Sequence, residues 1–141
     1  MRHPWLYFGR PVNTYNTERE RTLLDIVTAA FPGYQVENPT QPHHQQGYRD
    51  WKARTGNGMN YYYQIVLPKM DAGIFLSFAD GMWGAGVYNE ALFLAERGKP
   101  IYEISWDGQL ILPVTLDPAR RLSIDDTRRR VYGPAGQVLQ S

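Results

Sequence analysis

Short apolar runs and stretches with helical spacing alternate along this chain. Continuous apolar runs at residues 5–9 and 72–78 are typical of strands that are buried on both faces, as in a parallel sheet. Weaker strand patterns lie at residues 34–38 and 100–105. An Asp-Gly pair shortly after the last of these predicts a hairpin turn into a further strand that begins at residue 109.

Segments with helical spacing of apolar residues separate most of these strands. Thr17 and Glu20 form a capping-box pattern that predicts the start of a first helix, and a Pro-Gly pair at residues 32–33 ends it. A last helix is predicted to begin at Ser123, whose hydroxyl can cap it. The predicted helices occupy residues 18–31, 59–66, 87–97 and 123–132.

This alternation predicts an α/β fold. We expect a single flavodoxin- or Rossmann-like domain over residues 1–141, a three-layer sandwich around a mostly parallel sheet of about five strands. Residues 106–141 would form a C-terminal extension of this domain. In such sheets the ligand site lies beyond the carboxyl ends of the strands, where the strand order reverses. That rule selects residues 9–13, 38–44 and 77–86.

Residues 39–58 are polar and rich in Gln, His, Gly and aromatic residues. We interpret them as one long loop, a kind of segment that is often functional. His43 and His44 lie in it, and adjacent residues of an extended chain point to opposite sides. No carboxylate accompanies the pair in a pattern typical of metal ligands. We therefore predict a loop role rather than a metal site, and a contact with substrate stays open.

Composition narrows the classes of function. The chain is 43% hydrophobic and 21% charged, as expected of a folded globular protein. Its net charge of +1 provides no long-range attraction for nucleic acid polymers or anionic membranes, and the arginine run at residues 128–130 is typical of a solvated helix face. The absence of cysteine excludes disulfides and thiolate chemistry. The first apolar run is too short for a signal peptide or a membrane span, so we expect a soluble, cytoplasmic protein.

The stretch DGMWGAGVYNEALFLAERGKP, residues 80–100, joins a glycine-rich loop to a helix. Its glycine spacing differs from the dinucleotide-binding fingerprint, but such a loop can offer N–H groups to an anion, or it can simply form a tight turn. Glu90 lies at the edge of the apolar stripe of the helix, as a nucleophile or base, or as an acid that complements the helix dipole. Of the three tyrosines at residues 61–63, at least one belongs in the core and one can face the cleft.

Four short motifs follow one another along the first 104 residues. They are YFGRP at residues 7–11, MDAGIFLSF at 70–78, GAGVYNEA at 84–91 and RGKPIYEI at 97–104. This set resembles the nucleoside 2-deoxyribosyltransferase family, including its deoxynucleoside 5′-monophosphate N-glycosidase branch. In that family a Gly-containing loop follows the first strand, an Asp precedes a buried strand, and a Gly-rich loop leads to a helix that bears a Glu.

The resemblance implies an N-glycosidase or N-glycosyltransferase that acts on a (deoxy)nucleoside or its 5′-monophosphate. Glu90 would attack the anomeric carbon, and water or a second base would resolve the covalent glycosyl–enzyme intermediate. In the monophosphate branch, Arg10 and the N–H groups near residues 84–86 would hold the phosphate. No metal and no cofactor is implied, and family members are homodimers or larger homo-oligomers. The predicted substrate-binding residues are Tyr7, Gly9, Arg10, Asn38, Tyr63, Asp80, Gly84 and Gly86.

Two positions depart from the family pattern. The family carries an Asp about eight residues before the "aD" pair, where this chain has Tyr63, and the nearest upstream acid is Asp50. Tyr88 replaces a small residue that often lies two positions before the nucleophile. These departures leave a second hypothesis, a non-catalytic nucleotide-binding sensor on the same fold. A third is an interaction protein, in which four Trp and ten Tyr would serve an oligomer interface.

Overall fold

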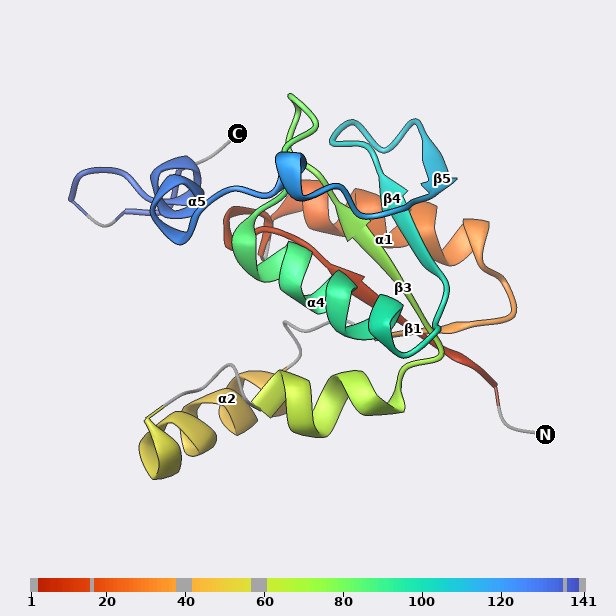
Figure 1. The fold of residues 1–141 in the computed structure, drawn as a ribbon, viewed down its shortest axis with the longest axis horizontal. Helices are drawn as coiled ribbons and strands as arrows, with labels where there is room; N and C mark the ends of the chain where they lie inside the picture. The colour runs from red at the N-terminus through yellow and green to blue at the C-terminus, as the bar shows by residue number, and fades with distance from the viewer. Residues whose placement is uncertain (1–2, 16, 38–41, 57–60, 136, 140–141) are drawn as a thin grey trace.

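The computed structural model describes residues 3–15, 17–37, 42–56, 61–135 and 137–139 of the chain (Figure 1). Five strands form one sheet in the order β2-β1-β3-β4-β5. The first four run parallel, and β5 runs antiparallel to β4. Their bounds are Trp5–Gly9 for β1, Gln35–Glu37 for β2, Ala72–Leu76 for β3, Ile101–Ile104 for β4 and Ile111–Pro113 for β5. The predicted α/β fold with a mostly parallel sheet is confirmed.

Helices cover both faces of this sheet, which makes three layers. Figure 1 shows α1 behind the sheet and α4 in front of it, with α5 at the end of the molecule where α4 begins. Their bounds are Glu18–Ala30 for α1, Pro42–Thr55 for α2, Ala85–Glu96 for α4 and Ile124–Val131 for α5. Shorter turns are the 3-10 helices η1 (Val12–Thr14), η3 (Leu67–Lys69) and η4 (Pro118–Arg120) and the π-helix η2 (Tyr62–Val66).

Alternate side chains of β1 enter two separate cores, because successive residues of a strand point to opposite faces. Leu6 and Phe8 join the core that α1 covers, in which Val27 is fully buried. Tyr7 joins the core on the opposite face, together with Phe75 of β3 and residues of η2, η3 and α4. Tyr7 is thereby directed toward α4, the helix that carries the candidate carboxylate.

The helix ends follow the capping signals in the sequence. Thr17 Oγ1 accepts a hydrogen bond from the Glu20 N–H at 3.1 Å, which is half of the predicted capping box. Ser123 Oγ accepts from the Asp126 N–H at 3.0 Å and caps α5 as predicted. Gly98, with a φ of 71°, follows α4 in the left-handed conformation that commonly terminates helices.

Helix α2 contradicts the prediction of one long loop over residues 39–58. The side of α2 that faces the protein carries His44, Gly47, Tyr48 and Trp51. A Cβ on Gly47 would lie 2.5 Å from the Tyr61 ring, so glycine lets the two segments approach closely. A helix face built from His, Gly and polar aromatics has little of the apolar periodicity on which the prediction depended.

The strand order reverses at β1, which lies between β2 and β3. The connections after β1 and β3 therefore diverge, and a crevice at their carboxyl ends is the usual ligand site of such a sheet. Gly9 ends β1 there, and the glycine-rich loop that leads to α4 follows β3. Of the three segments that the sequence predicts for the site, residues 9–13 and 77–86 follow β1 and β3 at this crevice, and residues 38–44 follow β2.

The segment after β5 packs against the loops at this crevice. Trp83 pairs with Arg121 in an isolated β-bridge, and Leu122 and Val131 pack with Phe78. Arg121, Leu122 and Val131 of the C-terminal segment therefore contact the loop that the topology assigns to the site. Within the described ranges, no helix is both long and apolar enough to cross a membrane.

Candidate active site

The side chains of Tyr7 and Glu90 meet at the crevice. Tyr7 comes from β1, and Glu90 comes from the second turn of α4. The Tyr7 hydroxyl donates a hydrogen bond to Oε2 of Glu90. Tyr7 is 1% exposed and Glu90 is 7% exposed. Glu90 is therefore a buried carboxylate with a specific partner, unlike a solvated acid that merely complements the dipole of its helix.

A cavity of about 160 Å³ adjoins this pair. Its lining comes from β1, the loop after β1, η2, the start of α4, and α5. Among the described residues that line the cavity, Glu90 is the one carboxylate. Convergent polar groups in a concave site at a switch point are the usual signature of a small-molecule site.

The surroundings set the protonation of this pair. Burial raises the pKa of Glu90 to about 7, against the opposing effects of the Tyr7 hydrogen bond and the Arg10 charge. Burial and then the charge of Glu90 raise the pKa of Tyr7 well above its usual value, so its hydroxyl remains a donor. Near neutral pH, Glu90 is available as a nucleophile when ionised and as a proton donor when protonated.

Arg10 follows β1 and is 3% exposed. Its Nη2 lies 3.1 Å from Oε1 of Glu20, and its Nη1 donates to the Phe8 carbonyl at 3.2 Å. The guanidinium also lies over the rings of Phe8 and Tyr15. Glu20 therefore balances much of the Arg10 charge before any ligand arrives.

The glycine-rich loop reaches the cavity as α4 begins. Gly84 is the N-cap of α4, and both Gly84 and Gly86 line the cavity, as predicted for a substrate loop. The Ala85 N–H donates to Thr127 Oγ1 of α5 at 2.9 Å. A side chain of α5 thus occupies one of the N–H groups that the sequence assigned to a phosphate.

Two ion pairs hold the C-terminal segment to the same end of the sheet. Arg130 pairs with Asp80 through both carboxylate oxygens, at 2.9 and 2.7 Å. Arg120 pairs in the same two-pronged way with Glu103 of β4. The hydrogen bonds from Arg130 lower the pKa of Asp80 to about 2. Such forked pairs fix geometry as well as charge, so α5 is positioned over the cavity.

Asp80 and the arginine run differ from their predicted roles. Asp80, expected to contact substrate, has its carboxylate paired with Arg130 and does not appear in the described cavity lining. The prediction of a solvated arginine face suits Arg129, whose side chain is 74% exposed, better than Arg130, at 34%. The sequence signal is the same for both arginines, and only the packing of α5 distinguishes them.

Gly9 acts by leaving space. A Cβ there would lie 2.6 Å from the Phe75 ring and 3.2 Å from Oε1 of Glu90. Glycine at this position therefore makes room for the carboxylate, although Gly9 is absent from the described lining. Asn38, the other predicted residue at a strand end, lies outside the described residues.

Of the three tyrosines at residues 61–63, Tyr62 is the one that lines the cavity. Tyr63, the predicted substrate contact, lies instead against Phe93, with ring centroids 5.8 Å apart. The cavity also has wall residues that sequence reasoning did not select, namely Tyr15, Thr127 and Val131. Tyr15 lies two residues past a selected segment, but nothing in the local sequence of α5 indicates that it forms a cavity wall.

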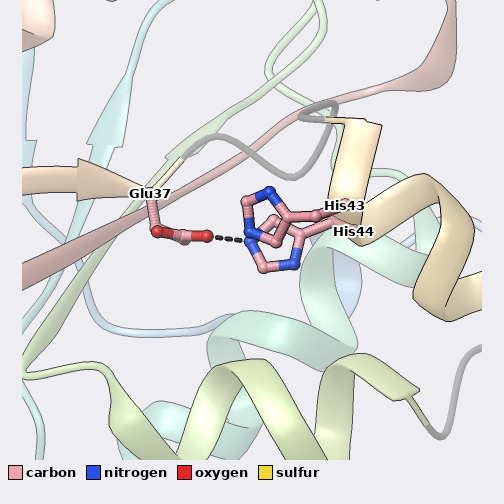
Figure 2. Close-up of side chains that lie close together, drawn as sticks. All are labelled: Glu37, His43 and His44. Atoms are coloured by element: carbon pink, nitrogen blue, oxygen red, sulfur yellow. Dashed lines mark hydrogen bonds and ion pairs between the residues drawn. The ribbon is translucent and has the colours of Figure 1, made fainter.

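A second cluster of polar side chains lies at the end of β2. Figure 2 shows Glu37 from the last position of β2 facing His43 and His44 from the first turn of α2. Glu37 Oε1 pairs with Nε2 of His44, and His44 Nδ1 lies 2.7 Å from the Tyr61 hydroxyl. The sequence interpretation, which found no carboxylate in a pattern typical of metal ligands near these histidines, missed Glu37, because β2 and α2 fold back on each other and bring Glu37 against His44.

Comparison of the chain with models of known protein families, with curated proteins and with solved structures finds no match. The resemblance to nucleoside 2-deoxyribosyltransferases therefore stays a prediction from sequence motifs.

Proposed function

We propose that this protein cleaves the N-glycosidic bond of a nucleoside, with Glu90 as the nucleophile. The observation that carries the proposal is the buried Glu90 carboxylate, oriented by Tyr7 and lining a cavity at the switch point of the sheet. The resemblance of the surrounding motifs supplies the class of substrate.

The chemistry divides into two displacements. Ionised Glu90 attacks the anomeric carbon, the C–N bond breaks, and its electron pair leaves with the base, which takes up a proton. Water or a second base then attacks the same carbon and releases Glu90, so the carboxylate is regenerated. Burial raises the pKa of Tyr62 to about 12, so its hydroxyl keeps its proton and can hydrogen-bond the departing base.

The geometry supports a nucleoside better than its 5′-monophosphate. Glu20 already balances Arg10, and Thr127 already accepts from the Ala85 N–H. A phosphate dianion would also lie close to the ionised Glu90, and like charges in a buried site repel strongly. The cavity of about 160 Å³ is smaller than the roughly 300 Å³ of typical complete ligand pockets, and suits a pentose with the base projecting outward.

The test is a panel of deoxy- and ribonucleosides with their monophosphates, assayed for free base by chromatography. Wild-type protein is expected to release base from at least one nucleoside faster than from its monophosphate. Glu90→Gln should release none, whereas Glu96→Gln, on the exposed last turn of the same helix, should retain wild-type activity. Release by Glu90→Gln at the wild-type rate would refute the nucleophile.

The second candidate is a nucleoside or nucleotide sensor that does not cleave its ligand. It is favoured by one observation, that no carboxylate besides Glu90 lies in the described cavity lining, in agreement with Tyr63 at the position of the family Asp. A sensor predicts thermal stabilisation by a ligand that is recovered intact. Stabilisation that survives Glu90→Gln, without free base from wild type, would select this candidate over the enzyme.

A homodimer or larger homo-oligomer belongs to the same proposal, since the resemblance implies one. Leu110 is 55% exposed and Leu112 is 52% exposed at the β5 edge of the sheet. Apolar side chains that are exposed in a single chain are common in contacts between subunits. Light scattering coupled to size exclusion measures the mass directly, and a mass of 16.3 kDa would exclude the oligomer.

A further inference from the structure

The cluster at the end of β2 combines three side chains that ligate metals. One ligand atom from each of Glu37, His43 and His44 lies within 4.8 Å of the other two. Glu37 and His44 are buried, and His43 is exposed. We propose that these three side chains bind a divalent transition-metal ion, with Zn²⁺ as the best match. The site is separate from the Glu90 cavity and does not depend on the proposed function.

The donor set favours this class of ion. Two imidazole nitrogens and one carboxylate oxygen are a known three-ligand set for Zn²⁺, and the same set holds Fe²⁺ in other proteins. Mg²⁺ and Ca²⁺ prefer sites built from oxygen, so a site with two histidines discriminates against them. Three protein ligands leave a fourth position open, which water can fill.

Small movements of the three side chains would let them hold one ion. With metal–ligand bonds of about 2.1 Å, tetrahedral ligand atoms lie about 3.4 Å apart. The ligand atoms of the three side chains now lie within 4.8 Å of one another. His43 is exposed, and its ring lies against that of His44 with centroids 3.9 Å apart. Glu37 and His44 are in direct contact (Figure 2), so their ligand atoms have to separate to about the tetrahedral distance before both can bind one ion.

The buried histidine is already oriented for ligation. Nε2 of His44 faces Glu37, and Nδ1 lies 2.7 Å from the Tyr61 hydroxyl. With an ion on Nε2, Nδ1 would carry the ring proton, and its N–H would donate a hydrogen bond to the Tyr61 hydroxyl oxygen. Histidine ligands almost always donate a hydrogen bond from their other ring N–H, which fixes the ring and raises its basicity.

The space around the cluster admits a fourth ligand. A cavity of about 290 Å³ is lined by all three proposed ligands and by Tyr61 and Lys69. The positive charge of Lys69 opposes a bare cation, and Glu37 supplies the compensating negative charge inside the site.

Aromatic contacts connect this cluster to the Glu90 cavity. Tyr61, the hydrogen-bond partner of His44, lies edge-on to Tyr62 with ring centroids 5.2 Å apart. Tyr62 lines the Glu90 cavity. An ion that fixes His44 therefore also holds Tyr61, against which Tyr62 of the cavity wall packs.

The experiment uses the full chain, stripped with EDTA and titrated with ZnCl₂ by calorimetry. One ion should bind per chain, and the midpoint of thermal unfolding should rise with Zn²⁺, because the ion binds the folded state. Co²⁺ should add visible absorption bands of a four-coordinate site. His43→Ala should weaken Zn²⁺ binding by at least about tenfold. The remaining histidine, His3, gives the matched control, and His3→Ala should bind as wild type does.

His43 is exposed, so His43→Ala should fold normally. A variant of the buried ligand, such as Glu37→Gln, can fail to fold, and the test does not depend on it. Absence of saturable Zn²⁺ binding to wild type would overturn the proposal. So would wild-type affinity in His43→Ala, loss of binding in His3→Ala, or equal binding of Mg²⁺ and Zn²⁺. Each readout is independent of nucleoside cleavage, so failure here leaves the proposal for Glu90 standing, and the reverse also holds.

Discussion

The hydroxyl of Tyr7 donates a hydrogen bond to the carboxylate of Glu90, 83 positions away along the chain. The contact joins the strand at the centre of the topological reversal to the helix that follows the glycine-rich loop. It also opposes the burial that raises the pKa of Glu90, because a donor stabilises the ionised form. The hydrogen bond therefore helps to set the pH at which Glu90 ionises.

Replacing Tyr7 by Phe should make Glu90 harder to ionise. The pKa of Glu90, about 7 in the wild type, rises when the donor is lost, by about one unit for a hydrogen bond to a charged group. The rising limb of base release against pH should move to higher pH by that amount. Activity near neutral pH falls, while activity at high pH recovers.

A change in the pH profile separates this role from a structural one. If Tyr7→Phe lowers base release equally at every pH, Tyr7 positions the Glu90 carboxylate without changing its pKa. Thermal unfolding of the variant provides the control, since Phe retains the packing of the Tyr7 ring against Phe75.

Glu90 should make the folded protein less stable as pH rises. Its pKa is about 7 in the folded chain against an ordinary 4.5, so the folded state binds the proton more tightly. The resulting stabilisation is complete below the ordinary pKa and is lost as pH rises through about 7. Between about pH 5 and pH 8 the loss amounts to roughly 2–3 kcal/mol in the free energy of unfolding.

Urea unfolding of wild type and Glu90→Gln at the two pH values measures this effect. The glutamine variant lacks the ionisation, so its advantage over wild type should grow with pH. Other groups titrate in both proteins and cancel in the difference. A difference that is constant between the two pH values would contradict the raised pKa.

Arg130 should restrain α5 more than Arg129 does. Arg130 pairs with Asp80 outside the helix, whereas Arg129 pairs with Asp126 inside it. Arg130→Gln should leave the free energy of unfolding within about 1 kcal/mol of wild type, because the pair is partly exposed. Amide exchange in α5 should nonetheless accelerate severalfold, while Arg129→Gln serves as the control. Equal acceleration in the two variants would show that the Arg130–Asp80 pair does not restrain α5.

Thr127 should stabilise the start of α4 from across the cavity. Thr127→Val keeps the shape of the side chain but removes the acceptor for the Ala85 N–H, at a cost of about 1 kcal/mol in the free energy of unfolding. Thr127→Ser retains the hydroxyl and should remain close to wild type. Urea unfolding compares the three proteins, and a valine variant as stable as wild type would show that the cap contributes nothing.

Local patterns were sufficient for most of the fold. The apolar run of β3 is buried at every position, and the glycine after α4 has the positive φ expected of a helix stop. These features depend on residues that are close in sequence. Helix α2 was not predicted because its inward face is built from His, Gly and aromatic residues, which pack against the core around Tyr61 and Tyr62 without the regular apolar spacing of an amphipathic helix.

The candidate site divides in the same way. Glu90 and the glycines around residue 85 were predicted because they follow a buried strand in a recognisable motif. Tyr62 and Thr127 were not, because their place in the cavity depends on how η2 and α5 pack in three dimensions. The contact between Glu37 and His44 was missed for the same reason, because it depends on how β2 and α2 pack and not on the spacing of the two residues in the sequence.

The wall that α5 adds to the cavity has a consequence for biosynthesis. Synthesis proceeds from the N-terminus, so every parallel strand is available before Thr127 and Val131 exist. At 5–20 residues per second, roughly one to four seconds separate completion of β4 from the start of α5. Thr127 and Val131 are therefore the last residues of the described cavity lining to be synthesised, so the cavity can close only after the rest of its wall exists.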